Sequence, residues 1–310
     1  MTGLPTRADV EAAATRIAPY LRVTPYLAAV SLPGLTDSVD LKLELLQHTG
    51  SFKPRGAFNR VLTDSVGAAG VIAASGGNHG AAIAYVARAL GHRAEVFVPE
   101  TSPPMKADRI RGYGATVMLG GARYDDAQAS ANERQRETGA LMVHPYDHGA
   151  TVAGAGTCGR EIDQQSGGID TVLVATGGGG LTAGTATWFE GRSKVVSVEP
   201  ETSQCLAAAL RAGARVEVPV EGLAIDSLGA RMVGAVPFAC AQAYGVEALT
   251  VSDDAIRAAQ RLIWAELRLV AEPGGAAALA ALLSGVYRPE SGERVCVVVC
   301  GANCDPTTVL

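Results

Sequence analysis

Lys53 is the residue of this chain that is best suited to covalent chemistry. It lies in the sequence Ser-Phe-Lys-Pro-Arg-Gly at residues 51–56, after a predicted strand at residues 39–45, and its proline suits the first turn of a helix predicted to run to residue 66. Because Phe52 and the proline make the surroundings partly apolar, we expect the pKa of the amine to be lowered, so that it can attack a carbonyl carbon. A surface lysine beside a helix start is the alternative. We expect the remaining lysines to be solvated: Lys42, Lys106 and Lys194.

A run of four glycines follows a predicted buried strand at residues 171–175 and precedes a predicted helix. Glycines leave the backbone amides bare at a helix N-terminus, which is what a phosphate site requires. No Lys-Ser or Lys-Thr pair follows the run, so it is not a P-loop. A dinucleotide site with Glu199 as the ribose-binding acid, or a tight turn without a ligand, are the alternatives. The loop comprises Gly177, Gly178, Gly179, Gly180 and Leu181.

Two further loops leave predicted strands. Ser-Gly-Gly-Asn-His-Gly at residues 75–80 combines backbone amides with Asn78, which suits a carboxylate or a ring hydroxyl. Helix capping is the commoner reason for an asparagine at such a position. The second loop, at residues 300–305, begins with Cys300 and leaves the last strand through a glycine, and it could be a simple strand end.

Apolar stretches of strand length alternate with amphipathic stretches of helix length along most of the chain. This pattern is typical of an α/β protein with a parallel sheet covered by helices on both faces. One such series, at residues 70–147, is predicted to form a small domain. It would be inserted into a large domain made of residues 1–69 and 148–310. Residues 216–236 carry no pattern to which we can assign a structure.

The composition of the chain argues against several classes of function. A net charge of -5 argues against a nucleic-acid partner, and no apolar run approaches membrane-spanning length. The N-terminus lacks the basic and apolar parts of a signal peptide, so we expect a cytoplasmic protein. The six cysteines have no framework spacing, and we expect reduced thiols. A metal site at Cys296, Cys300 and Cys304 is disfavoured because the first two would lie about 13 Å apart on one strand.

Together, and in this order, the loops at residues 51–56, 75–80, 177–181 and 300–303 resemble those of the fold type II pyridoxal-phosphate enzymes. The resemblance is to the serine/threonine dehydratase and serine racemase group, and it covers essentially the whole chain. It replaces the dinucleotide interpretation, which explains only the glycine loop. It implies two open, twisted, mainly parallel sheets with helices on both faces, pyridoxal 5'-phosphate as the cofactor, and a homodimer.

The resemblance also implies roles for single residues. Lys53 would hold the cofactor covalently and, once freed by the substrate amine, take the α-proton. Phe52 would pack near the cofactor ring, Asn78 would bond the 3'-oxygen, and Cys300 would face the pyridine nitrogen. The glycine loop, from Gly177 to Leu181, would hold the phosphate through backbone amides. The substrate carboxylate would be gathered, mostly through backbone donors, by Ser75, Asn78 and His79.

Cys300 indicates the type of reaction. A neutral thiol cannot keep the pyridine nitrogen protonated as an aspartate would, which favours elimination over transamination. We therefore expect a dehydratase that converts L-threonine, L-serine or both to a 2-oxo acid and ammonia. A serine racemase, a dehydratase of another 3-hydroxy amino acid, a β-replacement synthase and a non-enzymatic cofactor carrier are the alternatives.

Two departures from the group pattern matter. Racemases of the group carry a second serine in the asparagine loop, and here that position is Gly76. Some relatives bind a divalent metal through a glutamate followed six residues later by an aspartate. Here Glu199 is followed by Cys205, so we expect no metal at that position.

Overall fold

The computed structural model describes residues 3–102, 104–122 and 124–309. Its larger sheet has six strands in the order β1-β2-β10-β7-β8-β9. All neighbouring strands are parallel except β1 and β2, which are antiparallel. Because helices cover both faces, the central strands are buried and consist mainly of valine, leucine and other small or apolar residues. The strands are β1 (Tyr26–Val30), β2 (Val39–Lys42), β7 (Thr171–Ala175), β8 (Lys194–Pro200), β9 (Glu247–Val251) and β10 (Val295–Val298).

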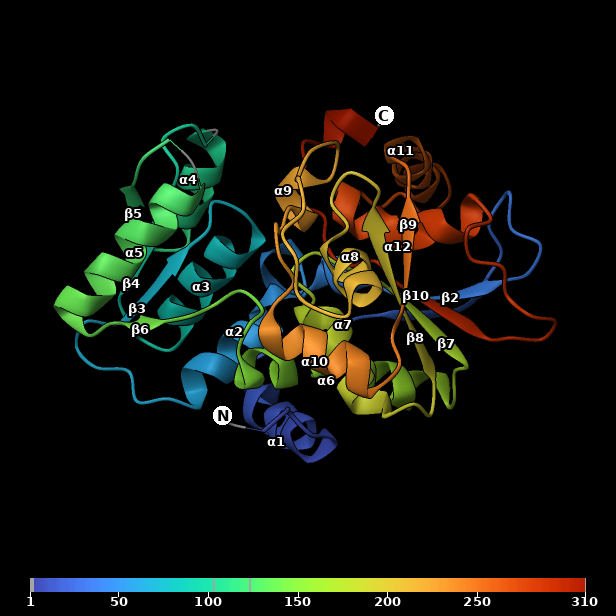
Figure 1. Cartoon of the computed structure of the whole chain (residues 1–310), viewed down its shortest axis with the longest axis horizontal. Helices are drawn as coiled ribbons and strands as arrows, with labels where there is room; N and C mark the ends of the chain where they lie inside the picture. The colour runs from blue at the N-terminus through green and yellow to red at the C-terminus, as the bar shows by residue number, and fades with distance from the viewer. Residues whose placement is uncertain (1–2, 103, 123, 310) are drawn as a thin grey trace.

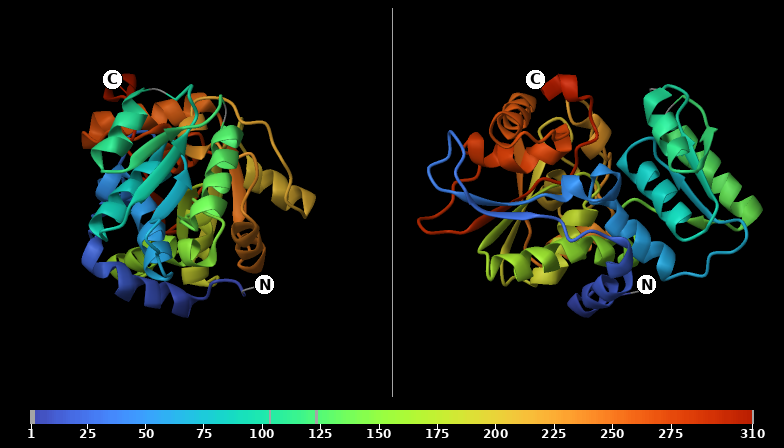
Figure 2. Two further views of the ribbon diagram at one scale, coloured as in Figure 1. Left: turned by 90° about the vertical axis from the view of Figure 1, so that its left-hand side faces the viewer. Right: turned by 180° about the vertical axis from the view of Figure 1, so that it is seen from behind.

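A smaller, fully parallel sheet has the order β5-β4-β3-β6. Its strands come from the chain between β2 and β7, so it is an insertion into the sequence of the larger sheet. Helices α3 and α5 both pack against β3 and β4, and α4 packs against α3 and β5. Figure 1 places this unit as a separate lobe, and the right-hand view in Figure 2 agrees. Its elements are β3 (Val71–Ala74), α3 (Asn78–Ala89), β4 (Ala94–Val98), α4 (Pro104–Gly112), β5 (Thr116–Leu119), α5 (Tyr124–Thr138) and β6 (Leu141–Met142).

Helices cover both faces of the large sheet. Helices α11 and α12 lie on one side of it, and α1, α6 and α7 lie on the other (Figure 1). Thr6 caps α1 with a reciprocal pair of hydrogen bonds to Asp9, as its sequence predicts. The helices are α1 (Arg7–Ile17), α6 (Gly149–Ser166), α7 (Gly180–Phe189), α8 (Cys205–Ala212), α9 (Ile225–Leu228), α10 (Ala235–Ala243), α11 (Asp253–Leu262) and α12 (Pro273–Leu283).

Helix α2 (Lys53–Leu62) joins the two units, because it packs against α6 of the large unit and α3 of the small one. Glycines on α6 allow this close approach. A Cβ atom on Gly154 would lie 2.5 Å from the Arg55 carbonyl oxygen, and one on Gly156 would lie 2.7 Å from the Gly184 carbonyl oxygen. Larger residues at these positions would push α2 and α7 away from α6.

A buried ion cluster fixes the base of α2. Arg55 is 1% exposed and pairs with Glu44 at 2.7 Å and with Glu161 at 2.8 Å. Lys42 joins the cluster through Glu161 at 2.6 Å and is fully buried. The prediction that Lys42 is solvated is therefore wrong, because a carboxylate distant in the sequence stabilises its charge in the interior.

The α/β class and the two mainly parallel sheets are as predicted, whereas some element ends differ. The strand predicted to reach residue 45 ends at Lys42, and the helix predicted to reach residue 66 ends at Leu62. Strands β1 and β9 and helix α10 were not predicted. All six cysteines are free thiols, and all but Cys304 are buried. Within residues 3–309, gaps excepted, no helix is long and apolar enough to cross a membrane.

Candidate active site

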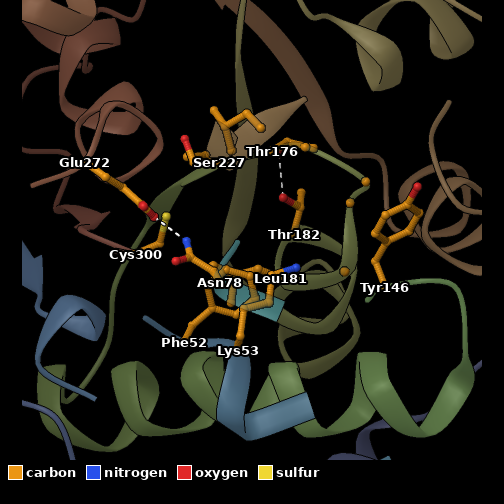
Figure 3. A pocket seen from close by; sticks show the side chains of 16 residues that line it. Phe52, Lys53, Asn78, Tyr146, Thr176, Leu181, Thr182, Ser227, Glu272 and Cys300 are labelled. Atoms are coloured by element: carbon orange, nitrogen blue, oxygen red, sulfur yellow. Dashed lines mark hydrogen bonds between the residues drawn. The ribbon is translucent and has the colours of Figure 1, made fainter. Parts of the chain in front are cut away.

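A pocket lies where the carboxyl ends of β7 and β10 meet the first residues of α2, α3, α7 and α12 (Figure 3). This edge of a parallel sheet is where α/β proteins usually bind ligands. About 450 Å³ of space free of protein atoms lies in the pocket and at its mouth, part of it open to solvent. Its lining residues are Phe52, Lys53, Asn78, Tyr146, Ala175, Thr176, Gly177, Gly178, Gly179, Gly180, Leu181, Thr182, Ser227, Leu228, Glu272 and Cys300.

Lys53 begins α2 and extends its amine into this pocket (Figure 3). Its Nζ lies 3.3 Å from the Pro145 carbonyl oxygen and 5.0 Å from the centre of the Phe52 ring. Burial lowers the pKa of Lys53 to about 8, although Cys300 and Glu272 favour the charged amine. Unlike Lys42, it makes no ion pair within the part of the chain that the structure describes. A sizeable fraction of neutral, nucleophilic amine is therefore present near neutral pH.

The glycine loop lies between β7 and the N-terminus of α7. Gly179 has a φ of 92°, a conformation that favours glycine. A Cβ atom on Gly177 would lie 3.1 Å from the backbone of Leu228, and one on Gly178 would lie 2.2 Å from the ring of Tyr146. Bare backbone at a helix N-terminus favours an anion such as a phosphate group. Thr176 and Thr182 flank the loop in the chain, and their hydroxyls are hydrogen-bonded at 2.6 Å (Figure 3).

Cys300 follows β10 and faces the pocket with only 3% of its surface exposed. Its thiol donates a hydrogen bond to the Gly274 carbonyl oxygen at 3.3 Å. Burial, and then the nearby Glu272 carboxylate, raise the pKa of the thiol well above its ordinary value. The group is therefore a neutral thiol at physiological pH.

Asn78 is held by two side chains rather than by its own helix. Its Nδ2 donates to Glu272 Oε1 at 2.6 Å (Figure 3), and its Oδ1 accepts from Asn303 Nδ2 at 2.5 Å. Gly77, not Asn78, is the N-cap of α3, so the helix-cap alternative for Asn78 is wrong. Glu272 is 4% exposed, and burial raises the pKa of its carboxyl to about 7.

Ser75 and His79 differ from the other candidates because neither lines the pocket. The Ser75 hydroxyl accepts from the Gly77 backbone amide at 3.3 Å. His79 is 5% exposed, and its Nε2 lies 2.7 Å from the Val143 carbonyl oxygen. Burial, and next the nearby Lys53, lower the pKa of His79 to about 3, so the imidazole is neutral. The structure therefore places these two residues beside the pocket loop residue Asn78 but not on the pocket wall.

An amine of lowered pKa, a glycine loop at a helix N-terminus and a buried thiol thus surround one pocket. The family model described as pyridoxal-phosphate dependent enzyme matches residues 17–301, which include all of these groups. The chain belongs to this family. The predicted family resemblance, fold type II and the cofactor pyridoxal phosphate are confirmed.

Members of the family that resemble this chain carry different names. The chain is 38% identical over 312 residues to the biosynthetic L-threonine dehydratase of Escherichia coli (strain K12), a match that covers 98% of this chain and 61% of that protein. It therefore spans about three fifths of that relative. Phenylserine dehydratase of Ralstonia pickettii is 36% identical over 318 residues, covering 99% of this chain and 96% of that protein. The structure of maize serine racemase has a TM-score of 0.94 at 29% identity and covers 99% of this chain and 96% of that chain.

The residues of the pocket fit the cofactor of the family. The glycine loop presents bare backbone at the N-terminus of α7, as a phosphate requires, and a Cβ atom on Gly177 or Gly178 would collide with Leu228 or Tyr146. Lys53 supplies an amine that is partly neutral for an aldehyde, and Asn78 and Cys300 offer neutral polar groups for the ring.

Several pocket residues were not predicted as site residues from the sequence. The sequence did contain a signal for Glu272 as a site residue, because a carboxylate directly before Pro-Gly-Gly is expected at the N-terminus of a helix. Tyr146, Ser227 and Thr182 had none, since the sequence does not indicate which elements face them.

Glu199 has contacts of another kind. Its carboxylate accepts from the amides of Leu206 and Ala207 at 2.8 and 2.7 Å, which caps the first turn of α8. The thiol of Cys205 donates to the Gly177 carbonyl oxygen at 3.2 Å. That no metal binds at Glu199 stays a prediction.

Proposed function

We propose that this protein is a dehydratase that converts L-threonine, L-serine or both to a 2-oxo acid and ammonia by β-elimination. The observation that carries the proposal is Cys300, a buried neutral thiol on the pocket wall. Bound pyridoxal phosphate withdraws electrons from Cα of an amino acid and so acidifies its α-proton. A neutral thiol facing the ring nitrogen would limit that withdrawal and would favour discharge of electrons onto a β leaving group. The names of the threonine and phenylserine dehydratases to which the chain is similar support the same reaction class.

Residue roles follow from the contacts in the pocket. Lys53 is the base that takes the α-proton, since its lowered pKa leaves a neutral amine available. Backbone amides from Gly177 to Leu181 hold the phosphate group. Phe52 and Asn78 would contact the cofactor ring, and Cys300 would face the ring nitrogen, since all three residues line the pocket. The backbone of the loop from Ser75 to His79 binds the substrate carboxylate.

Serine racemase is the rival function. It requires a proton donor on the face opposite Lys53, and Gly76 offers no side chain there. A Cβ atom on Gly76 would lie 3.3 Å from Ser102 Oγ, so a hydroxyl does lie near this position. Measurement of D-serine from L-serine separates the two functions.

Three further properties belong to the proposal. Residues 70–147 form a small domain within a large domain of residues 1–69 and 148–310, as the two sheets suggest. The protein acts as a homodimer in the cytoplasm, with an amino acid as its substrate. Neither nucleic acid nor a membrane is a partner.

The test is to incubate the purified protein with L-serine, L-threonine and L-phenylserine and to measure 2-oxo acid and ammonia. We expect equal amounts of both products with at least one substrate, and none with Lys53→Ala. Borohydride reduction of the loaded protein should label Lys53 and none of the other lysines. Loss of substrate without 2-oxo acid would exclude the dehydratase.

A further inference from the structure

A chain of hydrogen bonds joins helix α4 of the small sheet to the Glu272 carboxylate. Arg109 on α4 donates from Nη2 to the carbonyl oxygen of Thr49. That oxygen accepts a second hydrogen bond from Asn303 Nδ2 at 2.8 Å. Asn303 Nδ2 also donates to Asn78 Oδ1 at 2.5 Å, and Asn78 in turn donates to Glu272 at 2.6 Å. Segments far apart in the sequence thus meet beside the pocket.

Thr49 is the strained member of this chain of contacts. Its φ of 62° is rare for a β-branched residue, and Thr49 lies four positions before Lys53. The side chain is 6% exposed, and its hydroxyl has no hydrogen-bond partner among the residues that the structure describes. Such a conformation persists only when its surroundings fix it. The two donors on its carbonyl oxygen, from Arg109 and Asn303, are contacts that can do so.

Arg109 also acts on Glu272 through its charge. It is half-buried and has no ion pair with a carboxylate in the described parts of the chain. Its positive charge favours the ionised form of Glu272 and so opposes the effect of burial on the pKa of that carboxyl. Lys53 is the other cation that acts on Glu272, and the thiols of Cys300 and Cys304 are the neighbouring acidic groups.

We propose that Arg109 is a positioning residue: it locks the strained Thr49 turn and, through Asn303, holds Asn78 and Glu272 beside the pocket. A shift of α4 would therefore have two simultaneous effects: it would release the turn at Thr49, and it would change the charge of Glu272. The site would then be complete only when the small sheet lies in the position observed here. The consequence for turnover rests on the proposed function, whereas the ionisation of Glu272 does not.

The first test measures the ionisation of Glu272 in the protein without cofactor or substrate. An infrared pH titration follows the carboxyl band that is lost in Glu272→Gln, which separates it from the signal of Glu199. In Arg109→Ala the midpoint should rise by about half a pH unit or more, a threefold change in proton affinity. Arg109→Lys should stay close to wild type. Arg111→Ala is the matched control, because Arg111 lies on the same helix but pairs with Asp108 at 2.8 Å.

An unchanged midpoint in Arg109→Ala would overturn the proposal, even if the variant were less stable. Because no substrate is present, this result does not depend on whether the protein is a dehydratase.

The second test concerns the turn. Glycine adopts a φ of 62° without strain, so Thr49→Gly should make the turn less dependent on Arg109. We expect Arg109→Ala to lower kcat about tenfold with a smaller change in KM, and less than about threefold in the Thr49→Gly background. Equal losses in both backgrounds would refute the role of the turn.

Discussion

The titration of Lys53 tests the chemical basis of the site most directly. The pKa of this amine falls from the ordinary 10.5 to about 8 because α2 begins inside the pocket. At pH 7.5 roughly a quarter of the molecules then carry the neutral amine, against about one in a thousand for an ordinary lysine. The fraction of nucleophile therefore rises by about 200-fold.

Competitive acetylation of the cofactor-free protein, followed by mass spectrometry, measures this fraction. Trace reagent is added between about pH 6 and pH 11, and the rate at Lys53 is compared with that at the surface residue Lys194. We expect a midpoint near pH 8 for Lys53. Glu272→Gln should move the midpoint lower, because the Glu272 carboxylate favours the charged amine.

A midpoint for Lys53 above about pH 10 would refute the claim that burial activates this lysine. A rise of the midpoint in Glu272→Gln would refute the electrostatic account while leaving the burial intact.

Three further predictions concern other residues of the site. Cys300→Asp should protonate the ring nitrogen of the bound cofactor and raise transamination relative to elimination, while Cys300→Ser should have a mild effect. Unchanged product ratios and an unchanged cofactor spectrum in the aspartate variant would contradict this prediction. Gly76→Ser should form D-serine from L-serine, as measured by chiral chromatography. The backbone at Gly76 is not in the left-handed region, so Ser102 is the main group that must adjust to the new side chain. Abundant D-serine from the wild-type protein would instead favour the racemase. Burial raises the pKa of Glu272 and Glu199 to about 7, so the free energy of unfolding of the cofactor-free protein should fall as pH rises from 4.5 through 7. Glu272→Gln should remove about 3 kcal/mol of this loss, as measured by urea unfolding at the two ends of the range, while the part due to Glu199 stays.

The sequence predicted the loops of the site better than the side chains that complete it. The loops at residues 51–56 and 177–181 were identified as site loops because few structural roles require glycine, proline and a lysine in these orders. Glu272 was not assigned, since its importance depends on Asn78, a partner 194 positions away. The burial of Lys42 was missed for the same reason, because its partner Glu161 lies 119 positions along the chain.

The strands that were missed lie at the two edges of the large sheet. Strand β1 is partly exposed and pairs only with β2 in the sheet, and β9 pairs only with β8. Edge strands carry a weaker apolar pattern than central strands because only part of their surface is covered. The central strand β7, buried throughout, begins and ends at the predicted residues.

The position of β10 in the large sheet sets the order in which the protein can fold during synthesis. This strand lies between β2 and β7, yet it follows all the other described strands in the chain and so leaves the ribosome after them. Until β10 has been synthesised, β2 and β7 each have an unpaired edge, and the pocket lacks the side that carries Cys300. The small sheet, whose strands all lie between Val71 and Met142, can form long before. A nascent chain stalled before residue 295 should therefore hold a folded inserted unit beside an open, aggregation-prone sheet, and a chaperone would find its binding surface there.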